Sequence, residues 1–148
     1  MIQRNSILKE VLAYSLIVLF AYTAINKWLD PAPFIYVLNQ IPFVKDAAGL
    51  FAFLVPATEL LAAGLLVFPS MRKMGYALSF WLMLTFTGYV GGMLLFASHL
   101  PCSCGGIIQQ LGWPQHLVLN LVLTLCSYVA WRPRIGKENF FPNAFQPT

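Results

Sequence analysis

Charged residues are scarce in this chain of 148 residues: only 9% are Asp, Glu, Lys or Arg, whereas 59% are hydrophobic. A soluble domain needs roughly 25% charged residues to keep its surface hydrated, so this composition excludes an ordinary soluble globular fold. The mean hydropathy of +0.71 is typical of an integral membrane protein. We therefore expect one membrane domain over residues 1–148, without a second, soluble domain.

Acidic residues are fewer than basic residues, with five Asp and Glu against nine Lys and Arg, and the pI is near 9.1. A basic balance often indicates a nucleic-acid binder, but here seven of the nine basic residues fall in three short clusters, at 4–9, 72–73 and 132–137. Such clusters are typical of membrane orientation, not of a phosphate-binding face. We expect no nucleic-acid partner.

Long hydrophobic runs, in contrast, are abundant. Four of them approach the roughly 20 residues that a spanning helix needs, and they cover residues 7–28, 47–68, 75–100 and 116–131. The first run lacks the small-residue cleavage site of a signal peptide, so we expect it to be retained. The sequence thus predicts an all-α fold, an integral membrane four-helix bundle.

The basic clusters predict the orientation of these helices, because short cytoplasmic segments are enriched in Lys and Arg. The N-terminus, the turn near residue 72 and the tail over residues 132–148 carry the clusters and are predicted to be cytoplasmic. The loops 29–46 and 101–115 are poor in positive charge and are predicted to face outward. We expect a multi-pass protein of the bacterial cytoplasmic (inner) membrane, surrounded by lipid.

The first outer loop is predicted to contain a short interfacial helix. Asp30 followed by Pro31 is typical of a helix start, with the aspartate as cap, and Pro42 ends the segment. An apolar stripe lies between them, formed by Phe34, Ile35, Val37, Leu38 and Ile41.

In the third run, the GxxxG spacing of Gly88 and Gly92 predicts close approach by a neighbouring helix.

Cysteine is rare, with three residues in total, yet two of them stand together in Pro101-Cys102-Ser103-Cys104-Gly105-Gly106. A disulfide across one residue closes a very small ring, and strained disulfides are easily reduced. A redox-active pair is the leading interpretation. Two alternatives stay open, a structural staple and a metal site formed by Cys102 and Cys104 with His99 and His116. A one-residue spacing is unusual for zinc, so no metal is expected.

The cysteine loop returns through Trp113 and Pro114 to His116, with Asn120 one helical turn further on the same face. A histidine near the cysteines can activate a thiol, shuttle a proton or hydrogen-bond a quinone carbonyl. The alternative is an interfacial histidine that faces water or lipid headgroups. His99, at the other end of the loop, fits that ordinary role better.

Glu59 falls near the middle of the second apolar run, where an ionisable group is costly and needs a partner. Lys27, near the outer end of the first run, is one candidate, although pairing requires the helices to be offset. Asn26, Tyr22 and Tyr89 are other candidates. Glu59 is interpreted either as part of a proton relay or quinone pocket, or as a polar clasp between helices. Cys126 is expected to be a small core residue.

Together these motifs resemble the MauE/DoxX family of redox-associated membrane proteins. The resemblance rests on "YTAINKWLD", "LVPATELLAAGLLVFP", "PCSCGG" and "WPQHLVLN", and it extends from about Ile7 to Trp131. It is closest to the Bacteroidota branch with a CSCGG loop. It implies a four-helix bundle linked to periplasmic thiol chemistry, quinone-coupled sulfur oxidation or maturation of disulfide-bearing proteins. Carried over residue by residue, it marks Lys27, Glu59, Cys102, Cys104, His116 and Asn120.

The leading functional hypothesis is a membrane thiol-disulfide oxidoreductase or redox relay. Cys102 and Cys104, with His116, would exchange electrons with a periplasmic thioredoxin-like or disulfide-bearing protein. A quinone would be held near Trp113, His116 and Asn120, with Glu59 and Lys27 as further candidate binding residues. The alternative is a non-catalytic accessory subunit that stabilises a larger membrane or export complex. A small transporter is the third hypothesis. It ranks lowest because a transport pathway usually needs more polar lining than one carboxyl group.

Overall fold

The computed structural model describes residues 2–96 and 113–132, with side chains omitted for residues 2–6, 93, 96 and 113. Within these residues all regular structure is helical and no strand occurs. The elements are α1 (Ile2–Leu29), α2 (Ala32–Asn39), the 3-10 helix η1 (Lys45–Ala47), α3 (Ala48–Val67), α4 (Arg72–Phe96) and α5 (Trp113–Trp131). Each predicted apolar run thus lies largely within one long helix, and α1 begins earlier than predicted.

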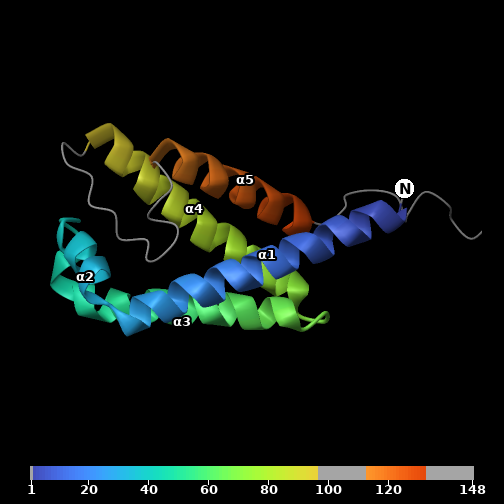
Figure 1. The fold of residues 1–148 in the computed structure, drawn as a ribbon, viewed down its shortest axis with the longest axis horizontal. Helices are drawn as coiled ribbons and strands as arrows, with labels where there is room; N and C mark the ends of the chain where they lie inside the picture. The colour runs from blue at the N-terminus through green and yellow to red at the C-terminus, as the bar shows by residue number, and fades with distance from the viewer. Residues whose placement is uncertain (1, 97–112, 133–148) are drawn as a thin grey trace, which may run out of the picture.

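The long helices pack as two pairs, α1 along α3 and α4 along α5 (Figure 1). The pairs are joined chiefly through α3 and α4, which follow each other across a short turn, while α1 makes few direct contacts with α4 or α5. The short helix α2 packs on the beginning of α3. This arrangement brings the start of α1, the α3–α4 turn and the end of α5 to one end of the molecule (Figure 1).

Small residues allow α1 and α3 to approach closely. Ala13, Ala24 and Ala62 are fully buried, and larger core side chains fill the space around them, namely Leu16, Phe20, Leu66, Tyr76 and Met83. Small residues at helix interfaces are typical of membrane bundles, where packing and not water exclusion holds helices together. Many large apolar side chains face outward instead, among them Val18, Leu61 and Val129.

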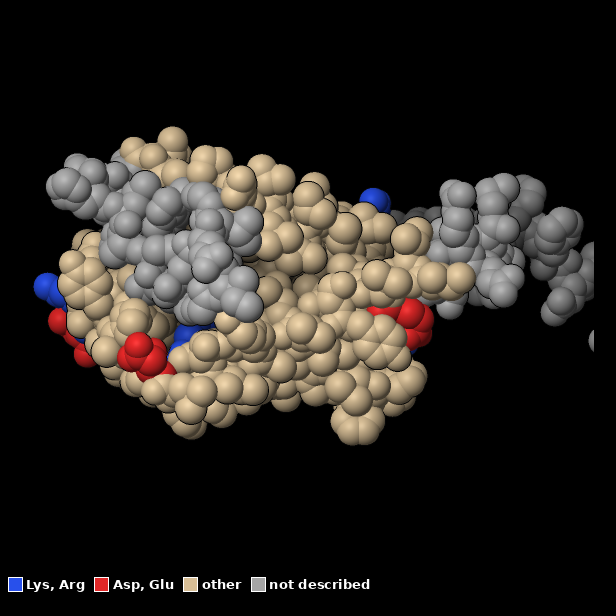
Figure 2. Space-filling view, in the orientation of Figure 1, with Lys and Arg blue, Asp and Glu red and all other residues tan. Residues whose placement is uncertain are grey.

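Figure 2 shows one face of the molecule, on which the visible Lys, Arg, Asp and Glu atoms lie toward the two ends and the other described atoms between them are uncharged. Among the described residues, two segments are long and apolar enough to cross a membrane, Ile7–Leu29 and Lys45–Val67. They overlap the predicted spans 7–28 and 47–68 almost completely and agree with a membrane protein.

The start of α2 corrects one local prediction. The helix begins at Ala32 with Pro31 as the capping residue, and no side chain caps it, so Asp30 is not the predicted cap. Pro33 lies in the first turn, where its missing N–H costs nothing. The buried residues Val37 and Leu38 turn the helix toward α3, where Leu38 packs with Ala48 and Ala52.

Close backbone approach occurs at a different glycine from the predicted pair. A Cβ atom added at Gly88 or Gly92 would meet no atom within 4 Å in the described part of the structure, so the GxxxG prediction is wrong there. At Gly75, by contrast, a Cβ would lie 2.9 Å from the Leu66 side chain and 3.0 Å from its backbone nitrogen. The tight contact follows from the short α3–α4 turn, which presses the first turn of α4 onto the end of α3.

Candidate functional site

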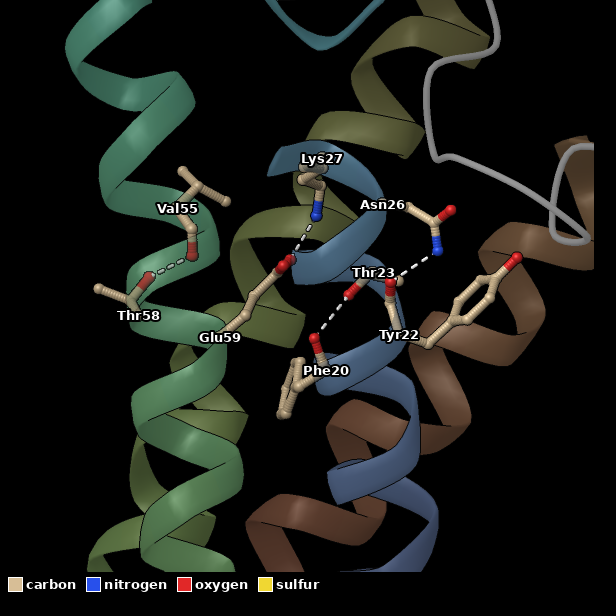
Figure 3. A network of polar contacts seen from close by, with 8 residues as sticks. All are labelled: Phe20, Tyr22, Thr23, Asn26, Lys27, Val55, Thr58 and Glu59. Carbon is tan, nitrogen blue, oxygen red and sulfur yellow. Dashed lines mark hydrogen bonds and ion pairs between the residues drawn. The ribbon is translucent and has the colours of Figure 1, made fainter. Parts of the chain in front are cut away.

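The most deeply buried charged residues form an ion pair between α1 and α3. The Nζ of Lys27 donates a hydrogen bond to the Oε1 of Glu59 (Figure 3). Lys27 is only 8% exposed and Glu59 is fully buried. Of the predicted partners for Glu59, the structure selects Lys27, because α1 and α3 are antiparallel and offset enough to bring the two residues to one level.

Two aromatic rings flank the ammonium group of Lys27. Its Nζ lies 5.4 Å from the ring centre of Phe34 on α2 and 5.1 Å from that of Phe86 on α4. A cation at this distance from a ring face is stabilised by the ring quadrupole, more strongly when it is removed from water. Four helices therefore contribute to this site, since α1 and α3 supply the ion pair and α2 and α4 supply the rings.

The second oxygen of Glu59, Oε2, is buried and has no hydrogen-bond partner in the described part of the chain. The Thr23 hydroxyl lies beside the carboxyl group but donates at 3.3 Å to the Phe20 carbonyl oxygen (Figure 3). Thr58, next to Glu59 in the sequence, donates in the same way to the Val55 carbonyl oxygen at 2.8 Å. A buried oxygen without a donor is costly, so this site has unused hydrogen-bonding capacity.

A second polar group lies along one face of α5. His116, Asn120 and Thr124 are at most 8% exposed although each is polar, and Ser127 on the same face is fully buried. Thr124 donates to the Asn120 carbonyl oxygen at 2.7 Å, and its hydroxyl lies 3.1 Å from that of Thr87 on α4. His116 and Asn120 thus share a face, as predicted, and His116 packs against the protein instead of facing water or lipid headgroups.

The two polar groups belong to different helix pairs. The Lys27–Glu59 ion pair joins α1 to α3, whereas the polar face of α5 packs toward α4. Phe86 on α4 reaches from the second pair to the Lys27 ammonium. The structure therefore brings Lys27 and Glu59 into direct contact and places His116 and Asn120 on the neighbouring helix pair.

The cysteine motif lies outside the described residues, as do Cys102, Cys104 and His99. Trp113 is the first residue of α5, and its side chain is likewise not described. Among the described residues no cluster of three or more His, Cys, Asp and Glu side chains could hold a metal ion. The redox, staple and metal interpretations of the cysteines all stay predictions.

Cys126 corrects a further prediction, because it is exposed on α5 and not part of the core. Its neighbour Ser127 occupies the buried face of the helix. One residue corresponds to a rotation of about 100° around a helix, which turns the cysteine outward.

A second ion pair, which was not predicted, lies toward the opposite end of α1. The Nη1 of Arg72 donates to Glu10, and its Nε donates to the Leu66 carbonyl oxygen at 3.1 Å. The hydrogen bond with Glu10 raises the pKa of the Arg72 guanidinium above its usual range. Tyr76 adds a hydrogen bond to the Lys9 carbonyl oxygen at 2.6 Å. These contacts tie the start of α1 to the α3–α4 turn.

Phe34 and Phe86 were also missed as parts of the site. Phe34 was expected only as part of the apolar stripe of the interfacial helix, and Phe86 only as a residue that packs or contacts lipid, because an aromatic residue within an apolar run carries no signal that a cation lies beside it. Only the rotation of α2 and α4 about their axes decides which rings face Lys27. That rotation follows from packing between helices, which no local pattern reveals.

Comparisons with known proteins agree with the predicted family. The family model described as methylamine utilisation protein MauE matches residues 5–132, which is most of the chain. No curated protein and no solved structure gave a significant match. The match includes both the Lys27–Glu59 ion pair and the polar face of α5, while the DoxX part of the resemblance stays a prediction. Together with the two apolar helices, the match supports a membrane protein, and the chain belongs to the MauE family.

Proposed function

We propose that this protein is a membrane-bound accessory protein of thiol oxidation, in which Cys102 and Cys104 exchange disulfides with a soluble periplasmic protein. The observation that carries the proposal is the Cys-Ser-Cys sequence in the segment between α4 and α5, which shortly precedes in the sequence the buried His116 in the first turns of α5. A histidine in that position supports thiol chemistry by accepting or returning a proton.

The proposed setting is a four-helix bundle in the cytoplasmic membrane with both termini inside. The arrangement of the helices supports this topology, because the start of α1, the α3–α4 turn and the end of α5 lie together at one end (Figure 1). The basic residues Lys9, Lys73 and Arg132 are at these positions. Positive charge gathered at one end is typical of the cytoplasmic side. The end of α4 and the start of α5 lie at the opposite end of the molecule, so the cysteine segment between them is proposed to face the oxidising compartment.

The proposed exchange balances as follows. A thiolate of the partner attacks the Cys102–Cys104 disulfide and forms a mixed disulfide, and the partner's second thiol then displaces the protein. The partner leaves with a new disulfide, and Cys102 and Cys104 become thiols after gaining two electrons and two protons. To be used again, the pair must pass two electrons and two protons to an oxidant within the membrane.

A quinone is the proposed oxidant, and when bound it supplies two-electron, two-proton acceptance. The described residues fit such a group, because Glu59 Oε2 is a buried acceptor without a donor and His116 and Asn120 are buried polar side chains. His116 and Asn120, with Trp113 at the start of α5, are proposed to direct protons and electrons from the cysteine segment into the bundle.

Thiol trapping in native membranes tests the proposal. After acid quenching, Cys102 and Cys104 are expected to resist alkylation until mild reduction, and then to react together. Cys102→Ser is expected to accumulate a mixed disulfide with a soluble partner through Cys104. Cys126→Ser is the matched control and should leave both patterns unchanged, because Cys126 faces away from the buried polar face of α5. The proposal fails if partner oxidation survives replacement of both loop cysteines.

A second candidate is a non-catalytic accessory subunit that stabilises a larger membrane complex. One face of α5 supports it, because exposed apolar residues recur there at helical spacing, namely Val118, Val122, Leu125 and Val129. Such a stripe suits contact with lipid or with a partner helix. Copurification of a stoichiometric membrane partner with the Cys102→Ser/Cys104→Ser variant would favour this function over thiol exchange.

A further inference from the structure

The Lys27–Glu59 ion pair leaves hydrogen-bonding groups on both residues unused. An ammonium group has three N–H donors, and in the described part of the chain Glu59 Oε1 is the single oxygen that accepts from Lys27. The rings of Phe34 and Phe86 also lie beside Nζ. On the other side, Glu59 Oε2 accepts no hydrogen bond from any described residue. The site therefore offers spare donors and a spare acceptor beside each other, within reach of two aromatic rings.

A merely structural clasp does not explain this arrangement. Two apolar residues of similar size stabilise a buried helix interface as well as an ion pair does, and often better. If the ion pair served only to hold α1 and α3 together, both oxygens of the carboxyl group would be expected to accept hydrogen bonds. A carboxyl oxygen without a hydrogen bond in a bilayer costs free energy. The Thr23 hydroxyl lies beside the Glu59 carboxyl group and also donates to the Phe20 carbonyl oxygen, while Thr58 points away from Glu59 (Figure 3). Within the described residues, Oε2 itself is left without a hydrogen bond.

Among the described residues, α1 and α4 are loosely joined where the ion pair lies. α1 and α4 make few direct contacts, and at this level the side chains of Lys27 and Phe86 bridge the two helices. Lys27 as a whole residue retains 8% exposure. A ligand that approaches between α1 and α4 displaces a cation–ring contact, which is weak compared with a hydrogen bond to a charged donor.

We propose that Lys27 and Glu59 bind the headgroup of a quinone, with Lys27 Nζ donating to the carbonyl oxygen of the oxidised form and Glu59 Oε2 accepting from the hydroxyl of the reduced form. The rings of Phe34 and Phe86 suit a planar, apolar headgroup, since aromatic rings pack with such ligands. The oxidised form would occupy a spare donor of Lys27, and the hydroxyl of the reduced form would supply the donor that Glu59 Oε2 lacks. The inference rests on the proposed function, because it names the site in the membrane domain at which the oxidant of the cysteines binds.

Photolabelling tests this site without any need for turnover. The purified full-length protein in lipid nanodiscs is irradiated with a short-chain azidoquinone, with and without excess unlabelled short-chain quinone, and the labelled peptides are mapped. We expect displaceable label on α1, α2 or α4 near Lys27, Phe34 or Phe86. Lys27→Met/Glu59→Leu is expected to lower the displaceable label by about tenfold or more, because it removes both polar contacts.

Two further variants separate binding from folding. Glu10→Gln/Arg72→Met is the matched control, because it removes the other ion pair, at the opposite end of α1, and should leave the label unchanged. Phe86→Leu keeps the ion pair and should weaken labelling by less than the double charge removal. Circular dichroism and the melting temperature of each variant verify that the helices remain folded.

The outcomes are distinct. Unchanged labelling in Lys27→Met/Glu59→Leu, an equal loss in the Glu10→Gln/Arg72→Met control, or no displaceable label in the wild-type protein would each overturn the proposal. Cys102→Ser/Cys104→Ser should bind the azidoquinone normally. If labelling fails while thiol trapping shows an exchanging cysteine pair, the proposed function stands and this site does not. If labelling succeeds while the cysteines prove inert, the quinone site stands and the proposed thiol exchange does not.

Discussion

At the scale of single residues, the cost of charge in a bilayer makes Lys27 and Glu59 interdependent. Removing one partner of a buried ion pair leaves the other uncompensated, so Lys27→Met should lower the free energy of unfolding by about 3–5 kcal/mol. Lys27→Met/Glu59→Leu should recover most of that loss, since it removes both charges. Thermal unfolding in detergent, followed by circular dichroism, measures the difference.

Lys73→Met provides the control for this prediction. Lys73 is exposed near the start of α4, and its replacement should change the unfolding free energy by no more than about 0.5 kcal/mol. A double variant as unstable as the single one would show that the ion pair contributes through packing and not through charge compensation.

Part of this site was predictable from sequence for the same physical reason. Glu59 needs a partner at its depth, and the shortage of charge leaves few candidates, of which Lys27 proved to be the partner. The contribution of Phe86 was not predictable, because it depends on how α4 is rotated about its axis. The outward position of Cys126 escaped prediction for that reason too, since one residue along a helix separates the core from the lipid-facing surface.

At the scale of helices, the tightest described contact at a glycine is between α3 and α4. Gly75→Ala should destabilise the protein by about 1–3 kcal/mol, because the new methyl group would clash with the backbone nitrogen of Leu66, which cannot move as a side chain can. Gly88→Ala, with nothing within 4 Å, should be neutral or stabilising by up to about 1 kcal/mol. Melting temperatures of the two variants in one detergent compare them directly, and a larger loss at Gly88 would contradict the structure.

The helices themselves were the most predictable level of the fold. Long apolar runs and turn-forming residues located α1, α3, α4 and α5 closely, and Pro42 followed by charged residues separated α2 from α3. The GxxxG prediction failed because a spacing of four residues places two glycines on one face of a helix but does not say what lies opposite that face. Gly75 had no such signal, since its contact is set by the length of the turn after α3.

At the scale of the whole molecule, the proposed topology predicts which surfaces are reachable from each side of the membrane. Phe43 lies between α2 and η1 and is 98% exposed, whereas Ser70 lies in the α3–α4 turn at the other end. In a variant whose native cysteines are serine, Phe43→Cys should react with an impermeant maleimide added to intact spheroplasts. Ser70→Cys should react only after the membrane is permeabilised. Labelling of both before permeabilisation would refute the topology with both termini inside.

The position of the ion pair also has a consequence for how the chain enters the membrane. Glu59 lies well inside α3 and cannot reach water from there, whereas Lys27 lies near the end of α1 and can extend toward the headgroups while it is alone. Because synthesis proceeds from the N-terminus, α1 is inserted first. The helix with the more costly charge therefore arrives after its counter-charge is already in place. Because of this order of synthesis, the Glu59 carboxylate does not enter the bilayer before a cation is available to pair with it. If the two residues were exchanged, the carboxylate on α1 would be inserted before its cation.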